Sequence, residues 1–135
     1  MQLTTKDHPT NTSLITDTLT VEKQLSRALA EQLLQPVGVI IDYSQRYQHW
    51  NYLVGYPVNL DGSRIDISTT RFSVDQAEGY FDDIFVALFD QSDTKPPGGE
   101  MIQFSYGATD APFIGWVEQY NLPGCLIDRK QQCIE

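Results

Sequence analysis

The sequence predicts an α+β domain: a curved antiparallel sheet of about four to five strands, packed against an N-terminal helix, with a further helix towards the C-terminus. Apolar runs with a period of two occupy the middle of the chain. Apolar stripes with spacings of three and four residues come before and after these runs. Polar segments rich in Gly, Pro and Asp separate the runs and favour hairpins over long crossovers.

The N-terminal helix is indicated by an apolar stripe made of Val21, Leu25, Ala28, Leu29 and Leu33. We expect it to begin near Thr18 and to end before Pro36, because the residue preceding a proline is pushed out of the helical region. Residues 1–17 have few apolar side chains and no period, which predicts a flexible lead. The folded domain is then expected over 18–127, with a flexible tail over 128–135.

A β-hairpin is predicted directly after this helix. On its first strand Val37, Val39, Ile41 and Tyr43 alternate with the residues between them, and on its second strand Trp50, Tyr52, Val54 and Tyr56 do the same. The polar residues 44–49 supply the turn. Side chains two apart in a strand share a face, so each set is expected on one side of the sheet.

The connection after the hairpin contains its own local signals. Asp61-Gly62 is typical of a turn, and Ile65-Asp66-Ile67 offers a brief alternating segment. Ser73-Val74-Asp75-Gln76 has the spacing of a capping box, in which the side chains of the first and fourth residues satisfy exposed backbone donors. With Gly79 as a left-handed stop, it predicts one short helix.

A second pair of strands follows. Residues 84–89 are apolar at every position, which is typical of a central strand buried on both faces. The returning strand covers 101–106, with Ile102, Phe104 and Tyr106 expected on one face.

The C-terminal helix is indicated by a stripe of Phe113, Trp116, Val117 and Tyr120. Asp110 is predicted as its N-cap and Pro112 fits its first turn, where a missing N–H costs nothing. Asn121 to Gly124 end the helix.

Size and charge limit the function classes. The chain has 135 residues, a hydrophobic fraction of 41% and a net charge of −9. No cluster of Lys and Arg is present, which disfavours nucleic acid and an anionic membrane as partners, although a basic protein would be attracted. No apolar run is long enough to span a bilayer, and the first twenty residues lack the apolar core of a secretion signal. We therefore expect a cytoplasmic protein.

The cysteines are Cys125 and Cys133. In a reducing compartment we expect free thiols, and in an oxidised preparation a terminal disulfide.

Catalytic combinations are scarce. The two histidines, His8 and His49, fall in the predicted lead and in a predicted turn. There is no Gly-x-Ser-x-Gly motif, and the glycines at 98 and 99 lack the Lys of a phosphate loop. Two thiols without a neighbouring histidine do not make a zinc site. We assign no catalytic residue, no metal and no cofactor, and an enzyme is disfavoured.

Aspartates near the strand ends offer an alternative chemistry: Asp42, Asp66, Asp82, Asp83 and Asp110. A carboxylate pushed into an apolar pocket, with a tyrosine as hydrogen-bonding neighbour, acts as an acid or base. Asp is equally typical of caps, turns and strand ends, and those structural roles are favoured for these residues and for Asp61.

Aromatic residues are abundant, with seven Tyr, six Phe and two Trp. Those on alternating strand positions and on the last helix are the candidate ligand-binding residues, namely Tyr43, Trp50, Tyr52, Tyr106 and Trp116. Trp50 and Trp116 are expected to contact each other as anchors of the sheet and the helix.

The order of several landmarks resembles a group of small uncharacterised bacterial α+β proteins. These landmarks are Trp50, Asp61-Gly62, Phe81-Asp82-Asp83 before Ala87-Leu88, Gly107-x-Thr109-Asp110, and then Trp116, Tyr120 and Pro123. The resemblance covers roughly Leu25 to Ile127 and implies a cystatin-like or nuclear-transport-factor-like shape, in which a curved antiparallel sheet wraps a helix. Members usually carry a tryptophan where this chain has Met101. The group has no assigned activity to carry over.

The leading hypothesis is a non-catalytic accessory protein that binds a partner or a small apolar ligand on an aromatic-rich sheet face and forms a homodimer through the other. One alternative is a small isomerase- or hydratase-type enzyme with an Asp/Tyr pocket. The other is an acidic inhibitor or immunity protein that neutralises a basic partner.

Overall fold

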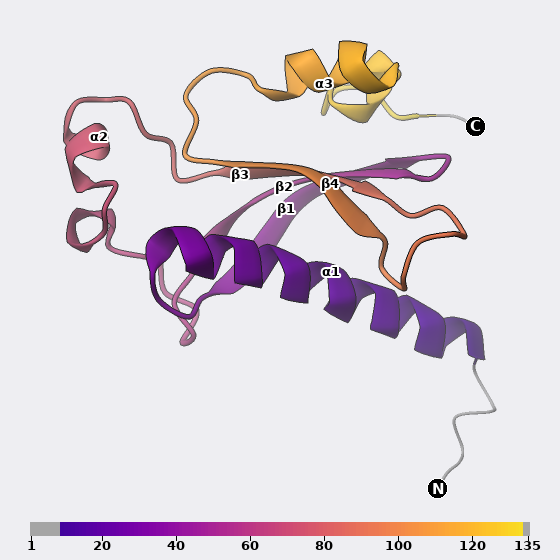
Figure 1. Ribbon diagram of the computed structural model, residues 1–135, viewed down its shortest axis with the longest axis horizontal. Coiled ribbons are helices and arrows are strands. Elements are labelled where there is room, and N and C mark those ends of the chain that lie inside the picture. Colours follow the sequence, from indigo (N-terminus) through magenta and orange to yellow (C-terminus); the bar gives the residue numbers. More distant parts are fainter. Residues whose placement is uncertain (1–8, 134–135) are drawn as a thin grey trace, which may run out of the picture.

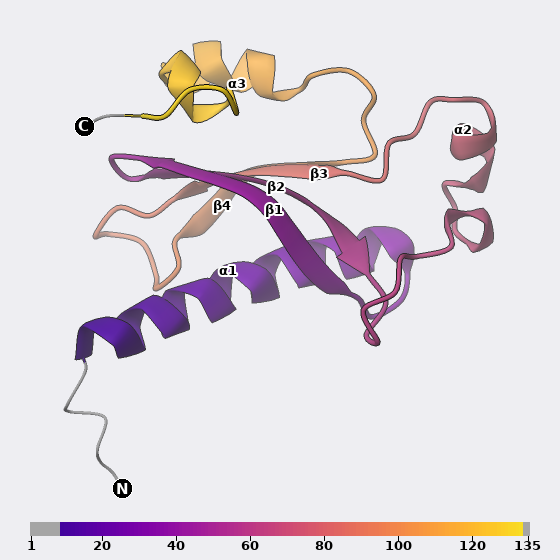
Figure 2. The same ribbon diagram turned by 180° about the vertical axis from the view of Figure 1, so that it is seen from behind.

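The protein is an α+β domain with the sheet in the middle of three layers. The computed structural model describes the backbone of residues 9–133 and the side chains of residues 20–133. The elements are α1 (Pro9–Leu33), β1 (Gly38–Tyr47), β2 (Trp50–Val58), η2 (Ile67–Thr69), α2 (Ser73–Ala77), β3 (Phe85–Asp90), β4 (Glu100–Tyr106), α3 (Phe113–Tyr120) and η3 (Gly124–Leu126). The four strands are antiparallel and adjacent in sequence order. Figure 1 shows α1 on one face of this curved sheet and α3 on the other, and Figure 2 shows the same layers from behind.

Helix α1 packs on the sheet through residues spaced by four. Val21, Leu25, Leu29 and Leu33 are all buried, and Leu25 and Leu29 are fully enclosed. Burying one such leucine side chain contributes about 1.5–3 kcal/mol. The helix begins at Pro9, earlier than the expected Thr18. The flexibility predicted for residues 1–17 stays a prediction, and residues 1–8 lie outside the described part of the chain.

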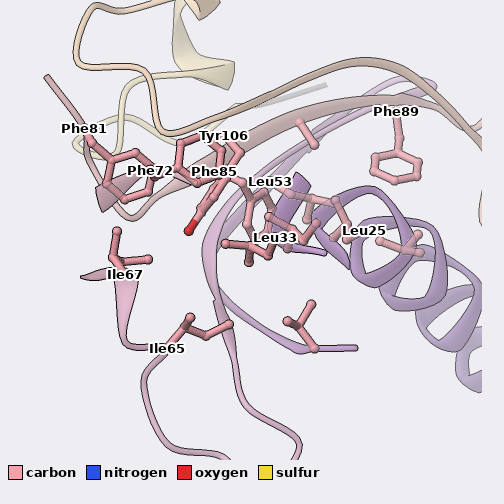
Figure 3. Close-up of a cluster of buried hydrophobic side chains, with 14 residues drawn as sticks. Leu25, Leu33, Leu53, Ile65, Ile67, Phe72, Phe81, Phe85, Phe89 and Tyr106 are labelled. Atoms are coloured by element: carbon pink, nitrogen blue, oxygen red, sulfur yellow. The ribbon is translucent and has the colours of Figure 1, made fainter. Parts of the chain in front are cut away.

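The larger core lies between α1 and the sheet (Figure 3). This α1-side cluster comprises Val21, Leu25, Leu29, Leu33, Val37, Leu53, Ile65, Ile67, Phe72, Phe81, Phe85, Ala87, Phe89 and Tyr106. At its end near α2, the rings of Phe72 and Phe81 stack with their centroids 4.8 Å apart, and Tyr106 meets Phe81 edge-on at 5.4 Å. The segment between the two hairpins therefore closes this end of the core.

A bulge in β1 changes which layer its side chains reach. The register with β2 shifts between Ile41 and Tyr43, so Asp42 is an extra residue. An extra residue reverses the alternation beyond it. Val39 and Ile41 pack against the α1-side cluster, whereas Tyr43 packs on the opposite face. The expectation that these three side chains share one face is wrong at Tyr43.

A second bulge has the same effect in β4. The partner of Leu88 is Gln103 and the partner of Phe89 is Met101, which leaves Ile102 without a partner in the register. Met101 packs against the α1-side cluster together with Phe104, while Tyr106 belongs to the cluster itself. Met101 therefore takes the place on this face that the sequence pattern assigned to Ile102.

Strand β3 is buried on both faces, as predicted. Phe85, Ala87 and Phe89 belong to the α1-side cluster, and Val86 and Leu88 face the other layer. The run begins one residue later than expected, because Ile84 is 48% exposed.

The two short segments after β2 differ in part from the pattern. Ile65 and Ile67 are buried and Asp66 between them is exposed, as the predicted alternation requires. The segment then continues into η2, which Asp66 caps by accepting a hydrogen bond from the backbone N–H of Ser68. Helix α2 does form over Ser73–Ala77, yet its N-cap is Phe72 and has no side-chain hydrogen bond. The predicted capping box is therefore wrong.

The C-terminal end of α2 is as expected. Gly79 has a φ of +81°, and the N–H groups of Gly79 and Tyr80 bond to the carbonyls of Gln76 and Asp75. These bonds form a Schellman motif, which satisfies the last carbonyls of the helix.

Candidate functional site

The second face of the sheet is covered by α3 and the segment that follows it. Its α3-side cluster comprises the buried residues Tyr52, Val54, Val86, Leu88, Trp116, Leu122 and Leu126, with further aromatic rings at its edges. Tyr52 is 2% and Trp116 7% exposed. The aromatic-rich face predicted as an open binding surface is therefore largely an interior, and any ligand must enter where the cover is incomplete.

The cover is incomplete beside the segment that leads into α3, where a pocket of about 240 Å³ opens. Its apolar lining is Tyr52, Val54, Ile84, Val86, Ala108, Pro112, Phe113 and Ile127. Its polar lining is Asp82, Ser105, Asp110 and Arg129. Strands β2, β3 and β4, the β4–α3 connection and the C-terminal segment all contribute, so the complete fold is needed to form the pocket.

Tyr52 is the most unusual residue of this pocket. Its ring meets those of Tyr43 and Phe113 edge-on, each with a centroid separation of 6.1 Å. The Tyr43 hydroxyl donates to the carbonyl of Leu126 at 3.3 Å. The Tyr52 hydroxyl, in contrast, makes no hydrogen bond with any residue in the described part of the chain. Burial raises the pKa of Tyr52 well above its ordinary value, so the phenol stays neutral and protonated at physiological pH.

The charged groups of the pocket are not equivalent. Arg129 contacts a carboxylate outside the pocket, that of Asp42, at 3.3 Å, and its guanidinium lies 5.0 Å from the centroid of the Tyr43 ring. Asp82 and Asp110 are exposed, and neither forms a salt bridge within residues 20–133. The pocket rim thus carries one cation that is paired with a carboxylate, Arg129, and two carboxylates that have no cationic partner, Asp82 and Asp110.

The residues predicted to bind a ligand do not form one group. Tyr43, Trp50, Tyr52 and Trp116 all belong to or border the α3-side cluster, whereas Tyr106 lies in the α1-side cluster beyond the sheet. Only Tyr52 lines the pocket.

Trp50 does not form the expected ring contact with Trp116. The ring that Trp50 meets on α3 is Tyr120, at 5.4 Å. Tyr120 accepts a hydrogen bond from the Gln103 side chain at 2.9 Å.

Asp110 is not the cap of α3. The N-cap is Pro112, without a side-chain hydrogen bond. Instead, Asp110 lies on the pocket rim. The other end of the helix follows the pattern, since Asn121 adopts a left-handed conformation with a φ of 54° and donates its N–H to Val117.

The Asp/Tyr pair expected of an enzyme does occur, but away from the pocket. Tyr106 donates its hydroxyl to Oδ1 of Asp83 at 2.7 Å, and Arg64 contacts Oδ2 at 2.8 Å. Both carboxylate oxygens are thus engaged in internal contacts. Neither Asp83 nor Tyr106 lines the pocket.

The C-terminal segment is held to the domain by a disulfide. Cys125 and Cys133 are bonded, with their Cα atoms 5.2 Å apart. The structure therefore has the terminal disulfide expected for an oxidised preparation and not the free thiols expected for a reducing compartment, because the turn formed by η3 and the residues after it returns the chain to within bonding distance. This segment carries Ile127 and Arg129 to the pocket.

His49 lies at the β1–β2 turn, as expected, and its Nδ1 is 3.0 Å from Oδ1 of Asp90. Burial alone would raise the pKa of Asp90, but hydrogen bonds from Ser92 and His49 outweigh it and lower the pKa. Neither residue of this pair lines the pocket. Within the described part of the chain, no group of His, Cys, Asp and Glu side chains is arranged to hold a metal ion.

Sequence reasoning missed Phe113, Ile127 and Arg129 as pocket residues. Phe113 was read as part of a core stripe, which it also is. Ile127 and Arg129 fall at the border of the predicted tail, and only the disulfide indicates that they turn back towards the sheet.

Over residues 9–133, no helix is both long and apolar enough to cross a membrane. Comparison of the chain with protein-family models, with curated proteins and with solved structures finds no match.

Proposed function

We propose that the protein is a non-catalytic binding module that holds a small, largely apolar ligand in the pocket beneath the lead-in to α3. The observation that supports this proposal is Tyr52, whose side chain is 2% exposed and lines the pocket, and whose hydroxyl has no hydrogen-bond partner among the described residues. The fully buried side-chain atoms without a partner among the described residues are Oδ1 of Asn51 and Oε1 of Gln91, so the Tyr52 oxygen is not sealed in the core. A ligand in the pocket that offers this hydroxyl a hydrogen-bond partner gains about 0.5–1.5 kcal/mol.

The size of the pocket limits the ligand. An apolar cavity of about 150 Å³ accepts benzene, and sites for drug-sized ligands begin at about 300 Å³. The pocket here, of about 240 Å³, therefore suits one ring or branched aliphatic group with a few further atoms. Its lining, apolar with few polar groups, is typical of small-molecule sites.

The arrangement favours binding over catalysis. General acid–base chemistry needs a carboxylate tuned by burial next to the reacting atoms. The carboxylates that line the pocket, Asp82 and Asp110, are exposed. The half-buried Asp83 is occupied by Tyr106 and Arg64. The isomerase-type alternative therefore lacks its central group at this pocket.

The compartment and the partners remain part of the proposal. A cytoplasmic protein was expected, but the Cys125–Cys133 disulfide favours an oxidising compartment, where such bonds persist. A homodimer and a basic protein partner stay predictions from the sequence.

The test titrates the full chain with benzyl alcohol and monitors binding through the chemical shifts of the backbone amides. A ligand of this size that gains about 0.5 kcal/mol per heavy atom binds with a Kd of about 1 mM. We expect the shifts to centre on Ile84, Val86 and Ala108. Ala108→Phe fills the pocket and should weaken binding at least about tenfold.

The matched control is Ala77→Phe, which makes the same change at an exposed position on α2. It should leave the affinity unchanged. The proposal fails if benzyl alcohol does not bind, or if Ala108→Phe and Ala77→Phe behave alike.

A further inference from the structure

We propose that the disulfide between Cys125 and Cys133 regulates the pocket. While the bond is intact, residues 127–133 form one side of the pocket and the ligand is retained, and reduction of the bond frees these residues and releases the ligand. Residues 127–133 are called the C-terminal wall below. This inference rests on the proposed function and adds the regulation of the same site to it.

The C-terminal wall contributes directly to the pocket. Ile127 and Arg129 both line it. Ile127 and Cys133 also pack against the α3-side cluster. Figure 1 shows this end of the chain, in yellow, beside α3 on the face of the sheet that is turned away from α1. The shape of the pocket therefore depends on the position of the wall, although most of the lining comes from the strands and the lead-in to α3.

The chain just before the wall is held without the disulfide. Leu126 is fully enclosed and belongs to the α3-side cluster. Its N–H donates to the carbonyl of Pro123 at 3.1 Å, and its carbonyl accepts a hydrogen bond from the Tyr43 hydroxyl at 3.3 Å. None of these contacts involves the bond between the sulfur atoms. We therefore expect η3 and α3 to stay in place when the bond is reduced.

The wall itself has weaker ties to the sheet. Arg129 contacts Asp42 at 3.3 Å, and these side chains are 54% and 47% exposed. The Arg129 guanidinium also lies 5.0 Å from the centroid of the Tyr43 ring. An exposed ion pair contributes little and is screened by salt. The backbone and side chain of Gln131 both donate to Asp128, inside the wall. The disulfide is thus the strongest tie between the far end of the wall and the domain.

The reduction is an ordinary thiol–disulfide exchange with a dithiol reductant. Cys125 and Cys133 are half-buried and not enclosed. A thiolate of the reductant attacks one sulfur and forms a mixed disulfide, which its second thiol then cleaves. The reductant leaves as its own disulfide, and each cysteine gains one electron and one proton to become a thiol. The loop that the bond closed, with a sequence separation of 8, is then open.

Opening this loop lowers the affinity of the pocket. A disulfide restricts the conformations of the chain that it closes. Once the wall is free, the ligand binds the fraction of molecules in which the wall is in place, and the apparent Kd rises by the inverse of that fraction. A wall that is in place about one-fifth of the time raises the Kd about fivefold.

The test titrates the full chain with benzyl alcohol in two states, oxidised and reduced with dithiothreitol, and monitors the chemical shifts of the backbone amides. Free thiols are counted in each sample. We expect a Kd at least about fivefold higher in the reduced protein, and recovery on reoxidation. Without ligand, reduction should shift the amides of residues 124–133 and leave those of Leu25 and Leu29, in the α1-side cluster, unchanged.

Variants separate the wall from the bond. Ile127→Ala removes a wall side chain while the bond stays intact, and should weaken binding by the oxidised protein about threefold. Reduction should then have a smaller effect than in the parent, because both changes act on the same wall. Ile114→Ala, the same substitution at an exposed position of α3 that does not line the pocket, is the matched control and should change neither result. The double variant Cys125→Ser, Cys133→Ser should bind like the reduced parent with or without dithiothreitol.

Equal Kd values for the oxidised and the reduced parent overturn this inference while the proposed function stands. A double serine variant that binds like the oxidised parent overturns it as well. So does a loss of amide dispersion over the whole chain on reduction, because the bond then supports the entire fold. If benzyl alcohol does not bind the oxidised protein, the inference and the proposed function fall together.

Discussion

Replacement of Gly55 by alanine tests how closely β1 and β2 approach next to the bulge. A Cβ added at Gly55 would lie 1.9 Å from the carbonyl oxygen of Ile40 and 2.9 Å from Cε2 of Phe85. The first atom is backbone and the second belongs to a fully buried ring, so neither can swing aside. Strand β1 would have to withdraw by roughly 1 Å, which is enough to break the hydrogen bonds on either side.

The cost follows from these two effects. Overpacking of a core costs about 1–3 kcal/mol, and each lost backbone hydrogen bond costs about 1 kcal/mol. We therefore expect Gly55→Ala to lower the free energy of unfolding by about 3–4 kcal/mol in urea denaturation followed by far-UV circular dichroism. Gly115→Ala is the control, because Gly115 lies in α3 with nothing near its Cβ position. It should raise stability by about 0.5–1 kcal/mol. A Gly55→Ala protein within about 0.5 kcal/mol of the parent would refute the reasoning.

Three further predictions concern stability. Burial raises the pKa values of Tyr52 and Tyr106, and for Tyr106 a hydrogen bond to a carboxylate adds to this. The unfolded chain therefore ionises first, so the contribution of these two tyrosines to the free energy of unfolding is fully present below about pH 10 and is lost above it by up to about 1.4 kcal/mol per pH unit for each tyrosine. Urea denaturation at pH 9 and pH 11 checks this. Between these two pH values the free energy of unfolding should fall less in Tyr52→Phe than in the parent protein. Reduction of the bond between Cys125 and Cys133, which closes a loop with a sequence separation of 8, should lower stability by roughly 2–3 kcal/mol. The double serine variant should be insensitive to reductant, and an equal response in both proteins would rule out the bond. Leu34 is exposed and has a φ of 59°. Leu34→Gly should raise the thermal midpoint, with a gain of about 0.5–1 kcal/mol, and a lower midpoint would show that the side chain contributes to packing.

The elements and their order followed from sequence periodicity, because local pattern and burial agree over most of the chain. Val21, Leu25 and Leu29 face the sheet as their spacing of four predicts, and the fully apolar run of β3 is covered on both sides. Such patterns are set by the layer that each residue faces, so they can be read from the sequence alone.

The bulges could not be predicted in this way. Asp42 and Ile102 each add one residue to a strand without interrupting its composition. A bulge is visible only against the partner strand, and the alternation reverses beyond it. This is why Tyr43 was expected beside Val39 and Ile41.

The pocket could not be predicted from the sequence either. It depends on how the segment after α3 returns over the sheet, and the disulfide that fixes this return was expected only for an oxidised preparation. Asp110 was expected to be a cap because Asp is typical of that position. The helix starts after Pro112 instead, which leaves the carboxylate on the pocket rim.

The central claim is that the Tyr52 hydroxyl is left free for a ligand, and the Tyr52→Phe protein tests it most directly because the ring and the packing are retained. The affinities of the parent and of the variant are compared for benzyl alcohol and for toluene. The account predicts that the variant binds benzyl alcohol about fivefold more weakly than the parent, since one hydrogen bond is lost, and binds toluene equally well. Equal affinity of both proteins for benzyl alcohol would contradict it.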